Sequence, residues 1–442
     1  MPLSVEVTKP TRMSEDVTAH PPDATDIFSN IGREVGLTDG FDQKILAYNI
    51  TQNAIEFSVE PDHVHYIQPN RTRVYARFKL LKGDGVGGLA TTGADDVVAP
   101  VNLLPAALFK SATVRCNDLV VGGTDMNHLA YKTYLETMCS YDKGAAETHL
   151  KSSFFYPDTP SKFDTNGPGN KGFAARQTLT AGSKYCEFMF PLNLDVLNVD
   201  KLFPPGLKLH FQLNLNDPKF YLQSDTSDRS YKIVVDMCYL YIRKIKVSTF
   251  LFNKHEQSLL KGDYCRYPYK RNVIKKMFLA ENQQSFFWQN AFSGALPGQV
   301  FMVMNVDAAD HGCYKLNPFN FRHFDLSECS LHVDGREMET FSVDFKDNRT
   351  QEMLYSFYEK IGIQNYNAGC SIDKKMFEGG ACIASWNLTA DKRGAMYERF
   401  GGMDLHMSFR NPLPKKVCVI LWGIFDDVLR ISPDKKMKTG HI

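Results

Sequence analysis

Residues 330–341 read SLHVDGREMETF, two short alternating segments on either side of an Asp-Gly pair. Asp-Gly readily adopts the positive φ angles of a two-residue turn, so this stretch predicts a tight β-hairpin. The chain contains the same plan once before, at residues 112–121, where ATVRCNDLVV has Asn-Asp in place of Asp-Gly. The repetition raises the hypothesis that one β domain is present twice.

Alternating apolar and polar segments dominate the rest of the chain. Each is rich in β-branched and aromatic residues and is bounded by Gly, Pro, Asn or Asp, which is typical of β-strands. They cover residues 73–82, 185–193, 207–215, 232–243, 299–307, 403–410 and 416–425. The pattern predicts an all-β fold.

The two halves of the chain match segment by segment and in the same order. Besides the hairpins, the matched pairs are RVYARFKLL with QVFMVMNVD, GLKLHFQLN with GMDLHMSFR, and KIVVDMCYLYI with KVCVILWGIF, which begin at residues 73 and 299, 206 and 402, and 232 and 416. Generic alternation could produce similar strands in any two β domains. Agreement in order across four pairs favours a true duplication.

One helix is expected after each hairpin, because apolar residues recur there at helical spacing. The two sets are Tyr131, Tyr134, Leu135 and Met138, and Leu354, Phe357, Tyr358 and Ile361. They predict helices at about 128–140 and 350–362. The first half is longer after its helix, and the turn-rich residues 141–183 account for the excess. We expect these residues to form an insertion at one end of the first sandwich.

The duplication divides the chain into four parts. Residues 1–41 are expected to form a flexible N-terminal arm, 42–250 the first β domain, 251–432 the second, and 433–442 a basic C-terminal tail. With 442 residues, 43% of them hydrophobic, the chain is long enough for two such domains.

Charge and apolar runs exclude several classes of protein. The formal net charge is only +1, so no global field attracts the molecule to nucleic acid or to an anionic membrane. The N-terminus lacks an apolar core of signal-peptide length, and the longest apolar run, residues 417–425, is too short to span a bilayer. We therefore expect a soluble chain that is not secreted and has no transmembrane segment.

No motif predicts a catalytic, cofactor or metal site. The ten cysteines include no Cys-x-x-Cys pair, which favours buried reduced thiols over zinc or disulfides. Gly83–Gly88 matches a dinucleotide-binding pattern but no helix follows it, and His63 and His65 have no further ligand at a fixed spacing. Paired carboxylates could still meet in space, although Asp426 and Asp427 would point to opposite faces of a strand.

One local charge feature remains, near the expected junction between the domains. Ten basic residues against two acidic ones give this stretch a local charge of about +8. They are Arg243, Lys244, Lys246, Lys254, Lys261, Arg266, Lys270, Arg271, Lys275 and Lys276. The alternatives are a solvated connector and a basic surface for acidic partners or packaged nucleic acid.

Six strings in order carry a resemblance to a known family. They are IEF at residue 55, LLPAALF at 103, AYKTYLET at 130, YCRYPYKR at 264, YKLNPFNF at 314 and LHVDG at 331. With them, residues 40–432 resemble the major capsid proteins of Maverick/Polinton elements and the related adintoviruses. The N-terminal 40 residues match no part of that pattern.

The resemblance implies a tandem double jelly-roll, two eight-stranded antiparallel sandwiches with short helices in the connecting loops. It implies a structural, non-enzymatic role without cofactors, in which three chains form a pseudo-hexagonal capsomer of an icosahedral shell around double-stranded DNA. The implied partners are other copies of the chain, neighbouring capsomers, and penton and minor capsid proteins, with DNA contacted only indirectly. The implied location is the virion capsid, assembled in the host cytoplasm or nucleus; a membrane contact is not specified.

Two alternatives stay open at this point. The first is a β-sandwich protein that binds or hydrolyses carbohydrate, which would need a cleft with aromatic rings and convergent carboxylates. The second is a host-retained protein derived from a capsid protein and used in another role. Intact strand alternation argues against a decaying gene copy.

Overall fold

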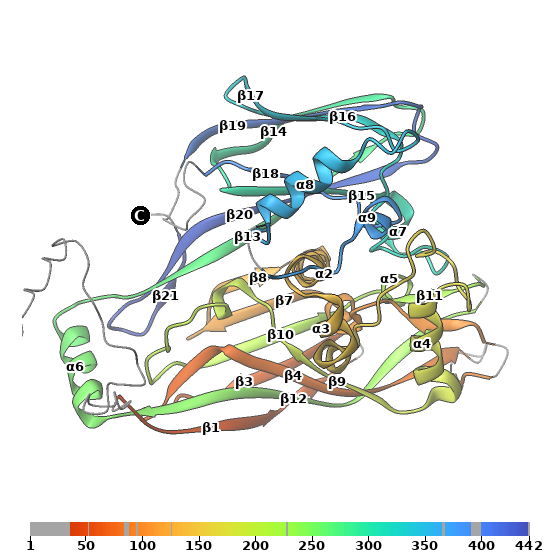
Figure 1. The fold of residues 1–442 in the computed structure, drawn as a ribbon. Helices are drawn as coiled ribbons and strands as arrows, with labels where there is room; N and C mark the ends of the chain where they lie inside the picture. The colour runs from red at the N-terminus through yellow and green to blue at the C-terminus, as the bar shows by residue number, and fades with distance from the viewer. Residues whose placement is uncertain are drawn as a thin grey trace, which may run out of the picture.

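The computed structural model describes residues 36–51, 53–83, 88–93, 96–124, 126–226, 229–364, 367–389 and 399–440. Most of the expected N-terminal arm, and most of the glycine-rich segment 83–88, lie outside these residues. Two β-sandwiches are stacked one above the other, and helix α2, His128–Ser140, lies between them (Figure 1). Within the described residues, no helix combines the length and the hydropathy that a membrane span needs.

The first sandwich consists of two antiparallel sheets. One sheet has the order β1-β12-β4, with β5 and β9 both pairing with β4: β1 Leu37–Leu46, β12 Tyr231–Val247, β4 Tyr66–Gly83, β5 Leu89–Thr91 and β9 Cys186–Pro191. The other has the order β2-β3-β10-β7-β8: β2 Asn49–Ile50, β3 Ala54–Val59, β10 Leu209–Leu215, β7 Phe109–Cys116 and β8 Leu119–Thr124. A small ladder pairs β6 Val98–Pro100 with β11 Leu222–Ser224.

The second sandwich repeats this arrangement. One sheet has the order β13-β20-β15-β18, with β21 pairing with β20: β13 Cys265–Leu279, β20 Val417–Ile431, β15 Gln299–Val306, β18 Ala384–Asn387 and β21 Met437–Lys438. The other has the order β14-β19-β16-β17: β14 Ser285–Ala295, β19 Phe400–Phe409, β16 Leu326–Val333 and β17 Arg336–Ser342.

Eight strands correspond one to one between the sandwiches in both chain order and sheet position. In chain order, β1, β3, β4, β7, β8, β9, β10 and β12 match β13 to β20. Each sandwich is therefore an eight-stranded antiparallel jelly-roll, and the predicted double jelly-roll is confirmed. All four strand matches made from the sequence fall on corresponding strands.

The two hairpins that suggested the duplication have the same turn. Asn117 and Asp118 both have positive φ angles, 46° and 67°, and Asp334 and Gly335 have 52° and 76°. Two successive positive φ angles define a type I′ turn, whose twist matches that of the flanking strands. Strand pairing closes directly on these turns, at Cys116 with Leu119 and at Val333 with Arg336.

Short helices occupy the connections between the strands. They are α1 Leu104–Leu108, α2 His128–Ser140, α3 Lys143–Glu147, η2 His149–Ser153, α4 Lys171–Thr180, η3 Ala181–Ser183, η4 Asp195–Leu197, α5 Pro218–Tyr221, α6 Thr249–Leu260, α7 Asp307–His311, α8 Gln351–Lys360 and α9 Lys374–Glu378. The two helices expected after the hairpins are α2 and α8. Helix α6, which joins the sandwiches at one end of the molecule, was not expected (Figure 1).

The ends of the two domains differ from the expected boundaries. Strand β1 begins at Leu37, so the first sandwich starts before residue 42. The expected C-terminal tail returns to the second sandwich, because Arg430 and Ile431 pair with Lys438 and Met437. The sequence suggested a basic tail and no strand there, because a two-residue strand is too short to give a sequence pattern.

Residues 141–183 are a packed helical segment and not only the turn-rich loop that we expected. They contain α3, η2, α4 and η3, and the side chains of Asp158 and Arg176 inside them are fully buried. Gly, Pro and Asn content predicts turns, but it does not reveal that charged side chains within such a segment pair with each other.

Candidate functional site

Helix α2 lies between the two sandwiches, and the contacts around it define what we call the seam: α2, η4, β13, β15, β20 and residues 314–321 (Figure 1). Ten of the thirteen residues of α2 are buried, among them the polar Lys132, Thr133 and Thr137. A helix at the surface of one sandwich would bury a single stripe. Burial all round therefore means that both sandwiches cover this helix.

Aromatic side chains form one part of the seam. The ring of Tyr134 stacks on Phe319 with centroids 4.1 Å apart, and Tyr131 packs edge-on against Phe319 and tilted against Phe321. These rings belong to the strings AYKTYLET and YKLNPFNF. Two of the strings that carry the family resemblance thus meet in space across the domain boundary.

A polar cluster surrounds the hydroxyl group of Tyr131. This hydroxyl donates to Asp310 Oδ1 at 2.8 Å and accepts from Asn305 Nδ2 at 3.1 Å, while Lys276 Nζ lies 2.6 Å from the same Asp310 oxygen. Burial, with the nearby Asp310 carboxylate, raises the pKa of Tyr131 well above its usual value. Every partner comes from the second sandwich, so the cluster fixes how the two domains sit against each other.

A second polar cluster is built on Lys132, whose side chain is only 3% exposed. Its ammonium group donates to Asp195 Oδ1 at 2.6 Å and to the backbone oxygen of Asn193 at 3.0 Å. Asp195 also accepts from the backbone N–H of Asn272 at 2.7 Å and from its Nδ2 at 2.8 Å. Asn272 Oδ1 in turn accepts from Trp422 Nε1 at 2.7 Å. The chain of bonds connects α2, η4, β13 and β20.

The helical segment 141–183 adds a third connection across the seam. Asp158 accepts from Arg176 at 2.6 Å, from Asn170 at 2.8 Å and from Asn317 of the second sandwich at 3.0 Å. Asp164 accepts from the backbone N–H of Asn317 at 2.7 Å. A buried carboxylate with several donors is stable where an unpaired one is not, so this segment is held firmly between the domains.

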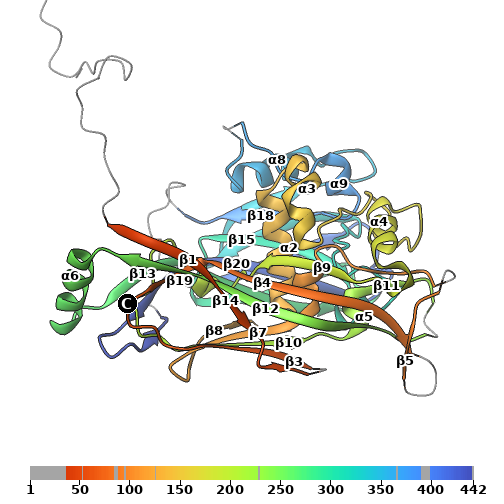
Figure 2. The same cartoon turned by 90° about the horizontal axis from the view of Figure 1, so that it is seen from below.

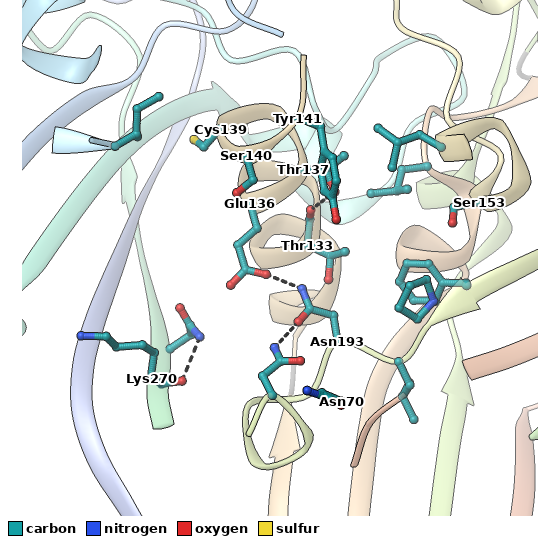
Figure 3. Close-up of a pocket in the computed structure, with 18 of the residues that line it drawn as sticks. Asn70, Thr133, Glu136, Thr137, Cys139, Ser140, Tyr141, Ser153, Asn193 and Lys270 are labelled. Atoms are coloured by element: carbon teal, nitrogen blue, oxygen red, sulfur yellow. Dashed lines mark hydrogen bonds between the residues drawn. The ribbon is translucent and has the colours of Figure 1, made fainter. Parts of the chain in front are cut away.

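A cavity of about 950 Å³ opens beside α2, between the two sandwiches. Figure 3 shows Glu136 pointing from α2 toward Asn193, which donates to its carboxylate. Burial raises the pKa of Glu136 above its usual value, although Lys132 opposes this shift. Among the described residues that line the cavity, Glu136 is the single carboxylate. Glycoside hydrolases generally use two, so the described lining of this cavity does not supply the carboxylate pair for that reaction.

Half of the ten basic residues between Arg243 and Lys276 are ion-paired within the chain. Five are ion-paired with distant acids: Arg243 with Asp42, Lys244 with Asp62, Lys270 with Asp426, Arg271 with Asp427 and Lys276 with Asp310. Lys275 lies 5.0 Å from the ring centroid of Phe292. The other four, Lys246, Lys254, Lys261 and Arg266, are exposed on or beside α6. Acids from elsewhere in the chain thus offset about half of the positive charge in this stretch.

Histidine and cysteine do not gather into a metal site in the part of the chain that the structure describes, where no group of three or more His, Cys, Asp or Glu could hold an ion. His65 instead bonds Asp62 at 2.9 Å. Six of the ten cysteines are buried as free thiols, and burial raises the pKa of Cys116 and of Cys238 to about 12. Thiols with such pKa values are poor nucleophiles at neutral pH.

Comparison with known proteins gives one relative by sequence and several by structure. No family model matches the chain. It is 22% identical over 394 residues to "Uncharacterized protein F54H12.2" of Caenorhabditis elegans, covering 85% of this chain and 91% of that protein.

The structural neighbours are double jelly-roll major capsid proteins. A chain in the cryo-EM structure of the Sputnik virophage has a TM-score of 0.64 and 10% identity, with 96% of this chain and 93% of that chain covered. The major capsid protein of mavirus has a TM-score of 0.53 and 11% identity, with 97% and 96% covered. VP54 of PBCV-1, fitted into a reconstruction of Sputnik, has a TM-score of 0.57 and 10% identity, with 94% of this chain and 99% of that chain covered. At these identities, the likeness establishes the fold.

Proposed function

We propose that the chain is a structural major capsid protein of the Maverick/Polinton and adintovirus kind. Three copies form a pseudo-hexagonal capsomer, and the capsomers tile an icosahedral shell around double-stranded DNA. The observation that carries the proposal is the pair of matching jelly-rolls held by a buried seam, in a chain that aligns over 96% of its length with a chain of the Sputnik virophage.

The seam suits a shell protein because it makes two domains behave as one rigid block. Stacked rings and buried hydrogen bonds cross it along its length, from Asp195 and Asn272 to Asp158 and Asn317. A block with two similar domains gives a trimer six similar sides, which is the outline that tiles a surface. The function proposed here is mechanical, and it calls for no enzymatic activity and no cofactor.

The proposed partners follow from the same role. Other copies of the chain would form the capsomer and its neighbours, while penton and minor capsid proteins would complete the shell in the virion. The DNA would be contacted only indirectly, because half of the basic residues between Arg243 and Lys276 are already ion-paired within the chain. The exposed basic residues beside α6 are the best candidates for an acidic partner.

Light scattering on the purified full-length protein tests the proposal. We expect a mass three times the 50.1 kDa of the chain and no hydrolysis on a panel of glycans. A stable monomer that cleaves or binds a glycan would contradict the capsid role and favour the carbohydrate alternative. A stable monomer that does neither would point to a host-retained protein with another use.

A further inference from the structure

The two most exposed large apolar side chains among the described residues belong to one helix. Leu260 is 86% exposed and Phe250 is 80% exposed, and both lie on α6, which joins the two sandwiches. Single apolar side chains on a protein surface are common and need no explanation. Two that are almost completely exposed on the same short helix are not explained by packing within the chain, so they indicate a surface that meets a partner.

Helix α6 has a bound side and a free side. On the bound side, Ser248 caps the helix by accepting from the backbone N–H of Leu251 at 3.4 Å. His255 Nδ1 lies 2.9 Å from the hydroxyl of Tyr66 on β4, and Leu259, one turn further along the helix, is buried. These contacts hold α6 against the first sandwich, so its free side has a fixed orientation.

The free side of α6 carries apolar and basic residues. Four exposed residues form one stripe along the helix, because they recur at spacings of four, three and four: Phe250, Lys254, Gln257 and Lys261. Leu260 and the exposed, polar Asn253 border this stripe. None of these six side chains is acidic, so the free side combines positive charge with apolar surface.

The acidic residues of this region lie off the stripe. Glu256, the one acidic residue of α6, is partly buried, and its carboxylate lies 3.6 Å from Lys435 Nζ. Asp263 follows the helix and is exposed. Two further cations, Lys246 and Arg266, are exposed beside the helix and exceed this single free acid. The region is therefore net positive where its apolar side chains project.

The position of α6 makes its free side accessible to an extended surface. Figures 1 and 2 show the helix from two directions, and in both it lies at one end of the molecule, where β12 ends and β13 begins. The high exposure of Phe250 and Leu260 means that little of the chain covers them there. A flat partner can therefore contact both side chains at once.

A lipid bilayer fits this combination of residues better than nucleic acid does. Nucleic acid offers phosphate groups to Lys254 and Lys261, but its phosphate backbone offers no apolar surface to Phe250 and Leu260. A bilayer with anionic lipids offers both, since apolar side chains insert among the lipids while basic ones bind the headgroups. Tyr264, half-exposed just after the helix, is also a residue type enriched at membrane–water interfaces.

We propose that the free side of α6 binds the surface of a membrane that contains anionic lipids. Phe250 and Leu260 insert among the lipids, and Lys254 and Lys261 contact the headgroups. The helix lies on the membrane and does not cross it. This binding requires neither a trimer nor a shell, so the inference goes beyond the capsid role and does not depend on it. It assigns a partner of stated chemistry to the exposed cations beside α6.

Flotation of the full-length protein with lipid vesicles tests this inference. We expect the protein to bind vesicles of phosphatidylcholine and phosphatidylserine. Vesicles of phosphatidylcholine alone should bind it more weakly by about 10-fold or more, because each basic residue near an anionic surface strengthens binding by about 5-fold. Raising the salt concentration from about 0.1 M to about 1 M should weaken binding to the mixed vesicles, because the Debye length falls from about 10 Å to about 3 Å.

Two double variants separate the apolar and the basic contributions. Phe250→Ser with Leu260→Ser should lower the affinity for mixed vesicles by about 10-fold or more, because both side chains leave water when they insert. Lys254→Gln with Lys261→Gln should lower it by about 25-fold, which is about 5-fold for each charge removed, and should reduce its salt dependence.

A third double variant, Leu89→Ser with Phe287→Ser, is the matched control. It removes the same two residue types from half-exposed positions elsewhere. Leu89 pairs with Gly83 at one end of β4, whereas the α6 contact through Tyr66 is at the other end. Phe287 lies on β14 in the second sandwich. This variant should bind the mixed vesicles as the wild-type protein does.

Circular dichroism shows whether each variant is folded, and light scattering on the same samples gives the oligomeric state. A folded wild-type trimer that does not bind mixed vesicles would overturn this inference and leave the capsid role intact. A monomer that binds them through Phe250 and Leu260 would support the inference and count against the capsid role. Equal vesicle binding by the Phe250→Ser, Leu260→Ser variant and the wild type would also overturn it. Displacement of both proteins by double-stranded DNA would then assign the cations to nucleic acid.

Discussion

Replacing Asp195 by alanine should weaken the seam more than any single exposed ion pair could. The Asp195 carboxylate is 16% exposed and bonds the buried ammonium group of Lys132 as well as the backbone and side-chain N–H groups of Asn272. Without it, Lys132 keeps the backbone oxygen of Asn193 at 3.0 Å and has Glu136 at 3.8 Å.

The size of the effect follows from these contacts. Removing one partner of a buried ion pair costs about 3–5 kcal/mol, and each N–H group left unpaired costs about 1–3 kcal/mol. Glu136 is close enough to replace part of the lost interaction. We therefore expect the free energy of unfolding to fall by about 3–4 kcal/mol. With an m-value above about 3 kcal/mol/M for a chain of this length, the urea midpoint should fall by about 1 M.

Tryptophan fluorescence is a suitable assay, because all three tryptophans lie in the second sandwich and Trp422 bonds Asn272 directly. Asp195→Asn keeps an acceptor for the Asn272 N–H, so it should lower the free energy of unfolding by less than Asp195→Ala does. Adding Lys132→Met to Asp195→Asn removes the ammonium charge that has lost its partner, so the double variant should recover part of the free energy of unfolding. A decrease below about 1 kcal/mol for Asp195→Ala, the value of an exposed pair, would refute the reasoning.

Three further predictions concern other parts of the chain. Arg176→Met leaves the Asp158 carboxylate buried without its cation, so it should cost about 3–5 kcal/mol and expose residues 141–183 to limited proteolysis, which the wild-type segment should resist. Burial alone would raise the pKa of Asp62, but its hydrogen bonds, above all the one from the Lys244 ammonium group, hold that pKa well below its usual value. The stability that the ionised Asp62 contributes should therefore be present above about pH 4 and be lost as the pH falls further. Asp62→Asn should flatten this decline in acid unfolding curves. Gly172→Ala should lower the unfolding temperature despite its helical position, because the new Cβ would lie 2.4 Å from the backbone oxygen of Pro157.

Each of these has a clear contrary result. Rapid cleavage of the wild-type protein within residues 141–183 would show that the segment is a loose loop. An acid unfolding curve that is the same for Asp62→Asn and wild type would mean that Lys244 does not stabilise the folded carboxylate. A Gly172→Ala variant as stable as the wild type would mean that the start of α4 moves easily away from Pro157.

Much of the fold follows from local patterns in the sequence. The type I′ turns at Asn117-Asp118 and Asp334-Gly335 depend on the residues that form them, and α2 and α8 depend on apolar spacing within one helix. Matching strand order then identified the duplication. These signals extend over ten to twenty residues, which is why they could be interpreted without a structure.

The seam could not be predicted in the same way. Lys132 donates to Asp195, which lies 63 residues further along the chain, and Asp195 accepts from Asn272, which lies another 77 residues on. No spacing rule connects residues so far apart. A hint existed, because Lys132 interrupts the apolar residues of α2, but a lysine on a helix is more often solvated. The ion pairs of the basic stretch could not be predicted for the same reason, since the acids that pair with it, such as Asp42 and Asp310, lie far away in sequence.

The most direct measurement of the central claim is electron microscopy of the purified full-length protein. The capsid role predicts three-fold symmetric particles with a hexagonal outline, formed by six similar lobes from three chains. Single two-lobed particles at micromolar concentration, or an assembly with two-fold symmetry, would contradict it.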